Sequence, residues 1–122
     1  MNTWLAIFIG GGIGSVMRYG VTRALLLFDV RGAFPWATLG ANVISCLILA
    51  VAVLRLQPML QDRPAASAFI AVGICGGFST FSTFSHENFL LIREGMPGMA
   101  VLNIAVNVVA CLSLFFFIAR TA

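Results

Sequence analysis

Four long apolar runs dominate this sequence, and they limit what the chain can fold into. They cover residues about 4–27, 36–54, 65–92 and 98–119. A run of about 20 apolar residues is enough for a helix to cross the hydrocarbon core of a bilayer. The chain of 122 residues is 61% hydrophobic and only 9% charged, which is typical of proteins that live in lipid. We therefore expect an all-α membrane protein with four transmembrane helices, with residues 1–122 forming a single domain.

The segments between the runs contain turn-forming residues and most of the charges. Residues 29–35, 55–64 and 93–97 each include proline, and Trp4 and Trp36 stand where aromatic side chains anchor helices at an interface. Because the arginines mostly flank the runs, we expect them to serve the membrane edges rather than to bind nucleic acid. We expect no cleaved signal peptide, so the protein should be a multi-pass protein of the cell inner membrane or plasma membrane.

The cysteines and the single histidine do not form a recognisable reactive site. Cys46, Cys75 and Cys111 all fall inside apolar runs, with no metal-binding spacing and no even number for a disulfide framework. We interpret them as small apolar residues of the helices. His86 stands next to Glu87, but a catalytic triad is defined by geometry and not by adjacency. We therefore expect that the protein is not an enzyme.

The first run contains a cluster of glycines and one arginine. Gly10 and Gly14 are one helical turn apart, a spacing that lets a second helix approach closely. A phosphate-binding loop would need a preceding strand, so we favour helix packing for these glycines. Arg18 stands in the same run, where a charge is costly. It is either a functional residue or a side chain that extends to the interface.

Amide and hydroxyl side chains interrupt the second and fourth runs. Thr38, Asn42 and Ser45 share one helix face, and Asn103 and Asn107 lie one turn apart. An amide in hydrocarbon needs hydrogen-bond partners, and contacts between helices can supply them. For Asn103 and Asn107 we favour such contacts, whereas Asn42 either makes such a contact or faces a permeating ligand.

Residues 76–85 are unusual for a hydrophobic span. Gly76 and Gly77 are followed by hydroxyl residues that alternate with three phenylalanines. Glycine permits a helix to open, and Ser and Thr can satisfy the backbone groups that an open helix exposes. Irregular backbone at membrane depth is tolerated only inside protein or beside a cavity. We therefore expect the third helix to be broken mid-membrane, between about residues 76 and 80.

A broken helix offers two opposite possibilities for binding. Its first half ends in free carbonyl groups, which suit a cation such as sodium, and its second half begins with free N–H groups, which suit an anion. Phenylalanine edges carry partial positive charge and can approach a small anion, although core packing is the alternative for these rings. An arginine at the mouth would attract anions. The candidate residues are Asn42, Phe81, Ser82, Thr83, Phe84 and Arg18, with Glu87 at the end of the segment.

The arginines are distributed almost evenly between the two sides of the expected bundle. Such a distribution gives almost no orientation preference under the positive-inside rule. A chain of this kind can insert both ways, and two copies in opposite orientations would form an antiparallel homodimer. Arg55, Arg63 and Arg120 fall on the side of the termini, and Arg23, Arg31 and Arg93 on the other, with Arg18 nearer to the latter.

Three motifs resemble those of the Fluc (CrcB-type) small dual-topology fluoride channel family, over essentially the whole chain. They are residues 11–19 (GGIGSVMRY), 35–42 (PWATLGAN) and 76–84 (GGFSTFSTF) with Glu87, of which the last is highly specific. The resemblance implies a fluoride-selective channel that exports fluoride passively and lowers cytoplasmic fluoride. It implies an antiparallel dual-topology homodimer with a structural sodium ion at the dimer interface, held by the backbone carbonyls of Gly76 and Ser79.

The resemblance also assigns roles along the fluoride pathway. Phe81 and Phe84 would be its ring-edge phenylalanines, and Asn42 would be its amide. Ser79 stands where the family usually has Thr, a change that should be tolerated because only the carbonyl would be used. The remaining assignments are Ser82 and Thr83 in a polar track, Glu87 as the acid after the motif, and Arg18 as the arginine of the first helix.

Two other classes of protein have to be distinguished from a channel. A proton-coupled small-molecule exporter of the small multidrug type is also a four-helix dual-topology dimer. It needs a titrating carboxylate within the membrane, for which Glu87 is the single candidate. A non-transporting assembly subunit would explain the glycines and asparagines but not residues 76–85.

Overall fold

The computed structural model describes residues 2–28 and 32–121, and every regular element within these ranges is helical. Four segments are long and apolar enough to cross a membrane: Thr3–Leu27, Trp36–Leu54, Pro64–Arg93 and Pro97–Thr121. The expectation of an all-α membrane protein with four membrane-crossing segments is therefore confirmed. Arg31 and the start of the turn expected at residues 29–35 lie outside the described residues.

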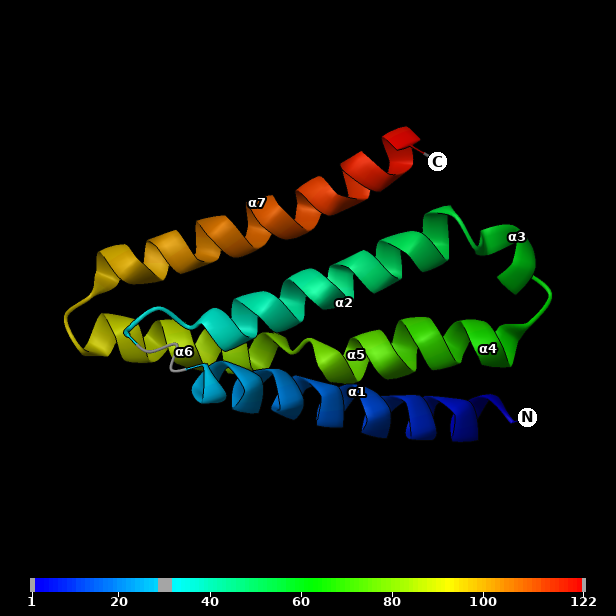
Figure 1. The fold of residues 1–122 in the computed structure, drawn as a ribbon, viewed down its shortest axis with the longest axis horizontal. Helices are drawn as coiled ribbons and strands as arrows, with labels where there is room; N and C mark the ends of the chain where they lie inside the picture. The colour runs from blue at the N-terminus through cyan, green and yellow to red at the C-terminus, as the bar shows by residue number, and fades with distance from the viewer. Residues whose placement is uncertain (1, 29–31, 122) are drawn as a thin grey trace.

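The segments consist of helices of different lengths (Figure 1). The first and last crossing segments are single helices of 25 residues each. A short helix, α3, lies within the turn expected at residues 55–64. In chain order the elements are α1 (Thr3–Leu27), α2 (Trp36–Leu54), α3 (Gln57–Leu60), α4 (Pro64–Ala68), the π-helix η1 (Phe69–Ile74), α5 (Cys75–Phe78), α6 (Phe81–Arg93) and α7 (Pro97–Thr121).

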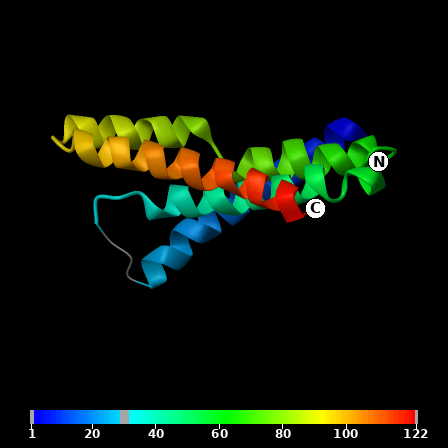
Figure 2. The same cartoon turned by 90° about the horizontal axis from the view of Figure 1, so that it is seen from above.

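The helices form an elongated bundle in which neighbouring segments run up and down. Both ends of the described chain lie at one end of the bundle, together with α3 (Figure 1). The turn between α6 and α7 lies at the opposite end, together with the start of α2. Seen from above, α6 and α7 run side by side and α1 crosses beneath the other helices (Figure 2). The helices α2 and α7 therefore run in the same direction.

The third crossing segment is not one continuous helix. Ser79 and Thr80, between α5 and α6, have extended backbone, with φ −110° and ψ 131° for Ser79 and φ −134° and ψ 131° for Thr80. The Thr80 hydroxyl accepts a hydrogen bond from the Thr83 N–H at 3.2 Å and caps the new helix. Gly76 and Gly77 are both helical, so the interruption follows the glycine pair. The expectation that this pair opens the helix is therefore wrong.

Glycines instead allow backbone contact between α1 and the third segment. A Cβ atom on Gly10 would lie 2.5 Å from the Phe69 carbonyl oxygen and 3.1 Å from the Gly73 Cα atom. A Cβ atom on Gly14 would collide with the carbonyl oxygen of Ile74. The expectation that Gly10 and Gly14 serve close helix packing is confirmed.

Gly77 has the same function on the opposite side of this contact. Its position leaves no space for a Cβ atom, which would collide with the carbonyl oxygen of Gly11. The absence of a side chain at Gly77 is therefore explained by the approach of α1. Gly76 differs, because a Cβ atom there would meet nothing within 4 Å.

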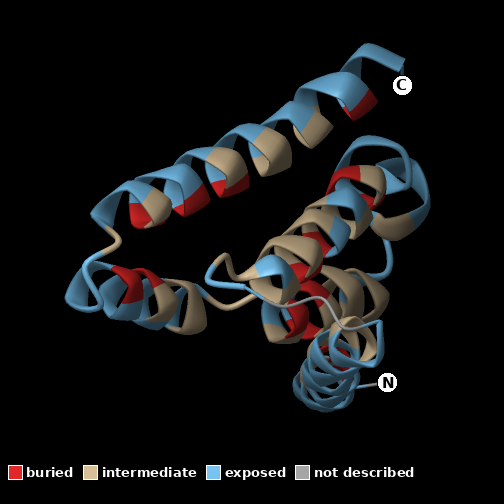
Figure 3. Ribbon diagram, turned by 60° about the vertical axis from the view of Figure 1, so that its left-hand side comes forward, coloured by how far each residue is buried: buried red, intermediate tan, exposed pale blue. Residues whose placement is uncertain are grey.

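The outer faces of the bundle are apolar and exposed. Trp4 is 84% exposed and Phe8 is 79% exposed, and α7 presents Phe116 and Phe117 in the same way. Buried residues form narrow stripes on the faces that the helices turn toward one another (Figure 3). Such a surface is suited to lipid rather than to water.

Candidate functional site

A row of hydrogen-bonded side chains connects the interruption after α5 with α2, α7 and α6. The Ser79 hydroxyl donates to Asn42 Oδ1 at 2.6 Å, and Asn42 Nδ2 donates to Asn107 Oδ1 at 2.7 Å. Asn107 Nδ2 then donates to Asn103 Oδ1 at 2.7 Å, and Asn103 Nδ2 donates to Asn88 Oδ1 at 2.8 Å. We call Ser79, Asn42, Asn107, Asn103 and Asn88 the amide network. Each member donates to the next, so the bonds fix which end of every amide is its donor.

Most of the amide network is removed from solvent and lipid. Asn103 is completely buried, and Asn107 and Asn88 are nearly so. Asn42 is half-buried and is the amide nearest to the interruption in the third segment. Its NH₂ group has two hydrogens, and one of them is used by Asn107. The network therefore holds Asn42 in one orientation, and its second N–H has no hydrogen-bond partner within the described residues.

A groove of about 250 Å³ opens beside this end of the amide network. Its wall combines polar groups of the network with aromatic and apolar side chains from α2, α6 and α7. The groove contains no charged side chain among the residues that line it. These residues are Asn42, Cys46, Ser79, Thr80, Phe81, Phe84, Asn107, Val108 and Cys111.

Two phenylalanines of α6 form part of the groove wall. The ring centroids of Phe81 and Phe84 lie 5.8 Å apart, and their planes are tilted by 47°. Phe81 is 78% exposed, whereas Phe84 is half-buried. The structure thus brings Phe81, Phe84 and Asn42 to one groove, and an apolar ring stands uncovered at its edge.

The hydroxyl residues of the motif lie beside the groove, around the start of α6. The hydroxyls of Thr80 and Ser82 lie 2.9 Å apart, and the Thr80 hydroxyl lies 3.4 Å from that of Thr83. Thr80, which the sequence analysis did not single out, is the centre of this cluster. Ser82 is exposed and Thr83 is half-buried, and neither is among the residues that line the groove.

Glu87 lies further along α6, in separate surroundings. Its carboxylate accepts a hydrogen bond from the Thr38 hydroxyl of α2. Glu87 also lines a second cavity of about 350 Å³, together with Glu94, Pro35 and Gly32. Within the described residues, this acid is therefore connected to the polar face of α2 but not to the groove.

Arg18 is directed toward the helix interruption. Its Nε atom donates to the carbonyl oxygen of Gly77 at 3.3 Å, in the last turn before the chain becomes extended. A positive charge is favourable at the end of a helix, where carbonyl groups lack N–H partners. Arg18 does not line the groove, so its contact is with the backbone of the interrupted segment.

Backbone carbonyls at the interruption could hold a cation. Among the described residues, no donor makes a hydrogen bond to the carbonyl oxygen of Gly76 or Ser79 outside helix α5. Gly76 is exposed, with open space around it. Neutral oxygen ligands of this kind suit a monovalent hard cation.

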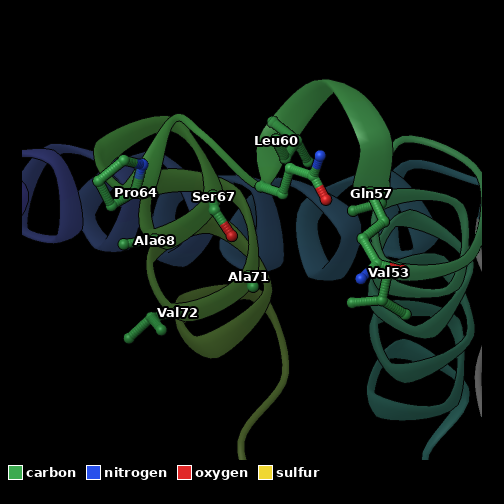
Figure 4. A pocket seen from close by; sticks show the side chains of 10 residues that line it. Val53, Gln57, Leu60, Pro64, Ser67, Ala68, Ala71 and Val72 are labelled. Atoms are coloured by element: carbon green, nitrogen blue, oxygen red, sulfur yellow. The ribbon is translucent and has the colours of Figure 1, made fainter.

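A larger cavity lies away from all of these residues. It has a volume of about 650 Å³ and lies between the end of α2, α3, α4 and η1 (Figure 4). Its wall includes Val53, Gln57, Leu60, Ser67 and Val72. None of the predicted site residues contributes to it, so convergent polar groups and not size identify the groove as the candidate site.

Three features of the site were missed by the sequence analysis. Asn88 was not among the predicted residues. Asn103 and Asn107 were expected to connect helices, which they do, but their connection to Asn42 was not foreseen. The hydroxyl of Ser79 was assigned no function, although it positions Asn42. Amides spaced one turn apart in a hydrocarbon span are the signal that could have indicated a network.

Comparison with known proteins identifies relatives over nearly the whole chain. Residues 5–119 match the family described as CrcB-like protein, Camphor Resistance (CrcB). The chain is 42% identical over 113 residues to the fluoride-specific ion channel FluC of Shewanella halifaxensis, covering 92% of this chain and 89% of that protein. It is 40% identical over 112 residues to FluC of Elusimicrobium minutum, covering 92% and 86%. It is 38% identical over 123 residues to FluC of Escherichia coli O17:K52:H18, covering 97% and 95%.

Proposed function

The chain belongs to the CrcB family, and from this membership we propose that it is a fluoride-specific ion channel. It lets fluoride leave the cell passively and so lowers cytoplasmic fluoride. The relatives are named as ion channels and not as enzymes, which agrees with the expectation that the protein is not an enzyme. The single observation that carries the proposal is the groove that is lined both by Asn42, an amide held by the amide network, and by two phenylalanine rings.

Fluoride is small and strongly hydrated, so a pathway has to replace its water with short donors. Asn42 offers an N–H held in place by the amide network, and the Ser79 hydroxyl determines which end of that amide is the donor. The edges of Phe81 and Phe84 carry partial positive charge and add weak attraction without a full charge. An ion held by such neutral groups can also leave, as conduction requires.

The hydroxyl cluster and Glu87 extend this pathway along α6. Ser82 and Thr83 lie around Thr80 at the start of α6, and Glu87 lies one turn beyond Thr83. We assign the two hydroxyl residues to a polar track and Glu87 to the end of this track. Arg18 contacts the last turn before the interruption, outside the groove, and its positive charge there attracts anions.

The channel is an antiparallel homodimer of two chains inserted in opposite orientations. Two observations support a second copy: the Phe81 ring is largely uncovered at the edge of the groove, and Gly76 is exposed, with space for a Cβ atom that would meet nothing within 4 Å. The balanced arginines favour insertion in both directions. In this arrangement the interruption at Ser79 and Thr80 lies mid-membrane and faces the partner.

A sodium ion at the dimer interface would stabilise the two interruptions against each other. The carbonyl oxygens of Gly76 and Ser79 from both chains would hold it, and their lack of other partners in the described chain supports this assignment. When bound, the ion supplies positive charge between two helix ends that carry partial negative charge. We place the protein in the cell inner membrane or plasma membrane as a multi-pass protein.

Fluoride efflux from liposomes that contain the purified protein tests this function. A channel should release fluoride down its gradient at the same rate with and without a proton gradient, once the membrane potential is clamped. An exporter of the small multidrug type would instead require the proton gradient, with Glu87 as its titrating acid. Efflux that stops when the proton gradient is removed would contradict the passive channel.

A further inference from the structure

Two free cysteines, Cys46 of α2 and Cys111 of α7, line the same groove as the amide network. The hydrogen bond from Asn42 to Asn107 fixes the register of the two helices. Because α2 and α7 run in the same direction (Figure 1), residues four positions further along both helices are displaced by one turn the same way. Those residues are Cys46 and Cys111, and their side chains are neighbours. A pair of thiols therefore faces the groove one turn beyond the amide contact.

The pair has the composition of a site for a soft, two-coordinate metal ion. Deprotonated thiols are soft ligands, and they select soft metal ions over hard ones. Zinc usually takes four ligands, and the described part of the chain holds no group of three or more His, Cys, Asp or Glu side chains that could bind a metal. A linear ion such as mercury(II) needs only the two sulfur atoms.

We propose that Cys46 and Cys111 form a dithiol site that binds a soft divalent metal ion in linear geometry. Binding of mercury(II) forms two Hg–S bonds, breaks two S–H bonds and releases two protons, with no change of oxidation state. Two thiolates and a divalent ion make a neutral complex, which suits an apolar surrounding where a net charge is costly. Sequence spacing could not indicate this site, because its ligands come from two different helices.

Accessibility distinguishes this pair from the third cysteine. Cys46 and Cys111 are half-buried and border the groove. Cys75 is buried, and its thiol donates to the Ser45 carbonyl oxygen at 3.6 Å. An ion in the groove thus reaches the pair and not Cys75. A bound ion also occupies space beside Asn42 and Phe84, so it should obstruct fluoride; this consequence rests on the proposed function of the groove.

Mercury(II) chloride added to the full chain in detergent tests the site directly. Bound mercury is measured by the mercury–thiolate absorption in the ultraviolet and by metal analysis after washing with glutathione, a competing monothiol. The wild type and the control Cys75→Ser should retain about one ion per chain. Cys46→Ser and Cys111→Ser should each retain it at least about a hundredfold more weakly, because one thiol lacks the advantage of two linked ligands.

The same four proteins are then reconstituted in liposomes, and each is compared with its own mercury-free fluoride efflux. After the same glutathione wash, mercury should still block efflux in the wild type and in Cys75→Ser, with recovery in dithiothreitol, whereas the other two variants should have regained their efflux. Equal mercury retention by the wild type, Cys46→Ser and Cys111→Ser would overturn the proposed site. If a serine variant does not fold, Cys46→Ala or Cys111→Ala takes its place. Retention by the pair without inhibition would support the metal site and contradict the groove as the fluoride route.

Discussion

Replacement of Asn107 by alanine should uncouple the amide network from the groove. Asn107 accepts from Asn42 at 2.7 Å and donates to the Asn103 backbone carbonyl at 2.8 Å and to the Asn103 side chain at 2.7 Å. Asn107→Ala therefore leaves the fully buried Asn103 without one donor and leaves Asn42 without the acceptor that fixes its amide. The substitution affects both the stability of the bundle and the geometry of the groove.

The two effects have different expected magnitudes. A buried polar group left unpaired costs about 1–3 kcal/mol, and side-chain hydrogen bonds between membrane helices contribute about 0.6 kcal/mol on average. We expect Asn107→Ala to lower the free energy of unfolding by about 1–2 kcal/mol, a loss that leaves the protein folded. Fluoride flux should fall at least about tenfold, because Asn42 can then rotate away from the groove, and a tenfold loss corresponds to about 1.4 kcal/mol.

Ser45→Ala is the matched control for this experiment. Ser45 is buried on α2 near Asn42, and its hydroxyl donates to the Cys75 carbonyl at 3.1 Å, outside the amide network. This variant should lose about 1 kcal/mol of stability and keep its flux. Flux is measured with a fluoride electrode on liposomes, and stability by thermal unfolding in detergent. Wild-type flux in Asn107→Ala, or an equal flux loss in Ser45→Ala, would refute the reasoning.

Further substitutions and the removal of sodium test other parts of the structure. Phe81→Ile and Phe84→Ile keep the apolar volume of the side chain but remove the ring edge. If the rings only pack, such a volume-conserving substitution should cost under about 1.5 kcal/mol of stability and leave fluoride flux unchanged. We expect flux to fall sharply while the protein stays folded, and unchanged flux in both variants would show that the rings only pack. Gly14→Val should prevent correct assembly of the helices, because its side chain would collide with the Ile74 carbonyl oxygen. Gly12→Val is the control, because a Cβ atom on Gly12 meets nothing within 4 Å, and this variant should assemble normally. Both are compared by size-exclusion chromatography. Ser79→Ala should keep any bound sodium but lower fluoride flux, because it removes the hydroxyl that donates to Asn42. Prolonged replacement of sodium by potassium should lower fluoride flux in the wild type. Full flux in strictly sodium-free buffer would argue against the ion.

The helices that cross the membrane could be predicted from the sequence because their ends are chemically defined. Proline stands at or near the boundary of every predicted turn, and the apolar runs between these turns are of membrane length. The expected bounds lie within two residues of the observed ones, and those of the second segment are identical. The contact of Gly10 and Gly14 was also predictable, because a glycine pair in a membrane helix has a well-understood packing function.

The details of the third segment could not be predicted from the sequence. Gly76 and Gly77 suggested an opening at the glycines, but Gly77 is helical and receives α1 against its backbone. The helix ends only after Phe78, because Thr80 caps the start of α6 with its hydroxyl. Whether a glycine serves flexibility or close approach depends on the neighbouring helix, which the local sequence does not reveal.

The candidate site was predicted in its members better than in its connections. Asn42, Phe81 and Phe84 were expected to act together, and they line one groove. The bond between Asn42 and Asn107 joins residues 65 positions apart, so it depends on the packing of α2 against α7. The bond to Asn88 depends on the packing of α6 against α7, and the bond from the Ser79 hydroxyl to Asn42 depends on the packing of the third segment against α2.

Selectivity between fluoride and chloride is the most direct test of the central claim. The reconstituted wild-type protein should pass fluoride and exclude chloride strongly. Fixed amide and hydroxyl donors with ring edges can replace the water of a small anion but cannot move apart for a larger one. Efflux of both ions is measured from the same liposomes, each down an equal gradient. Rapid fluoride release with chloride retained is the predicted result, and comparable release of the two ions would contradict it.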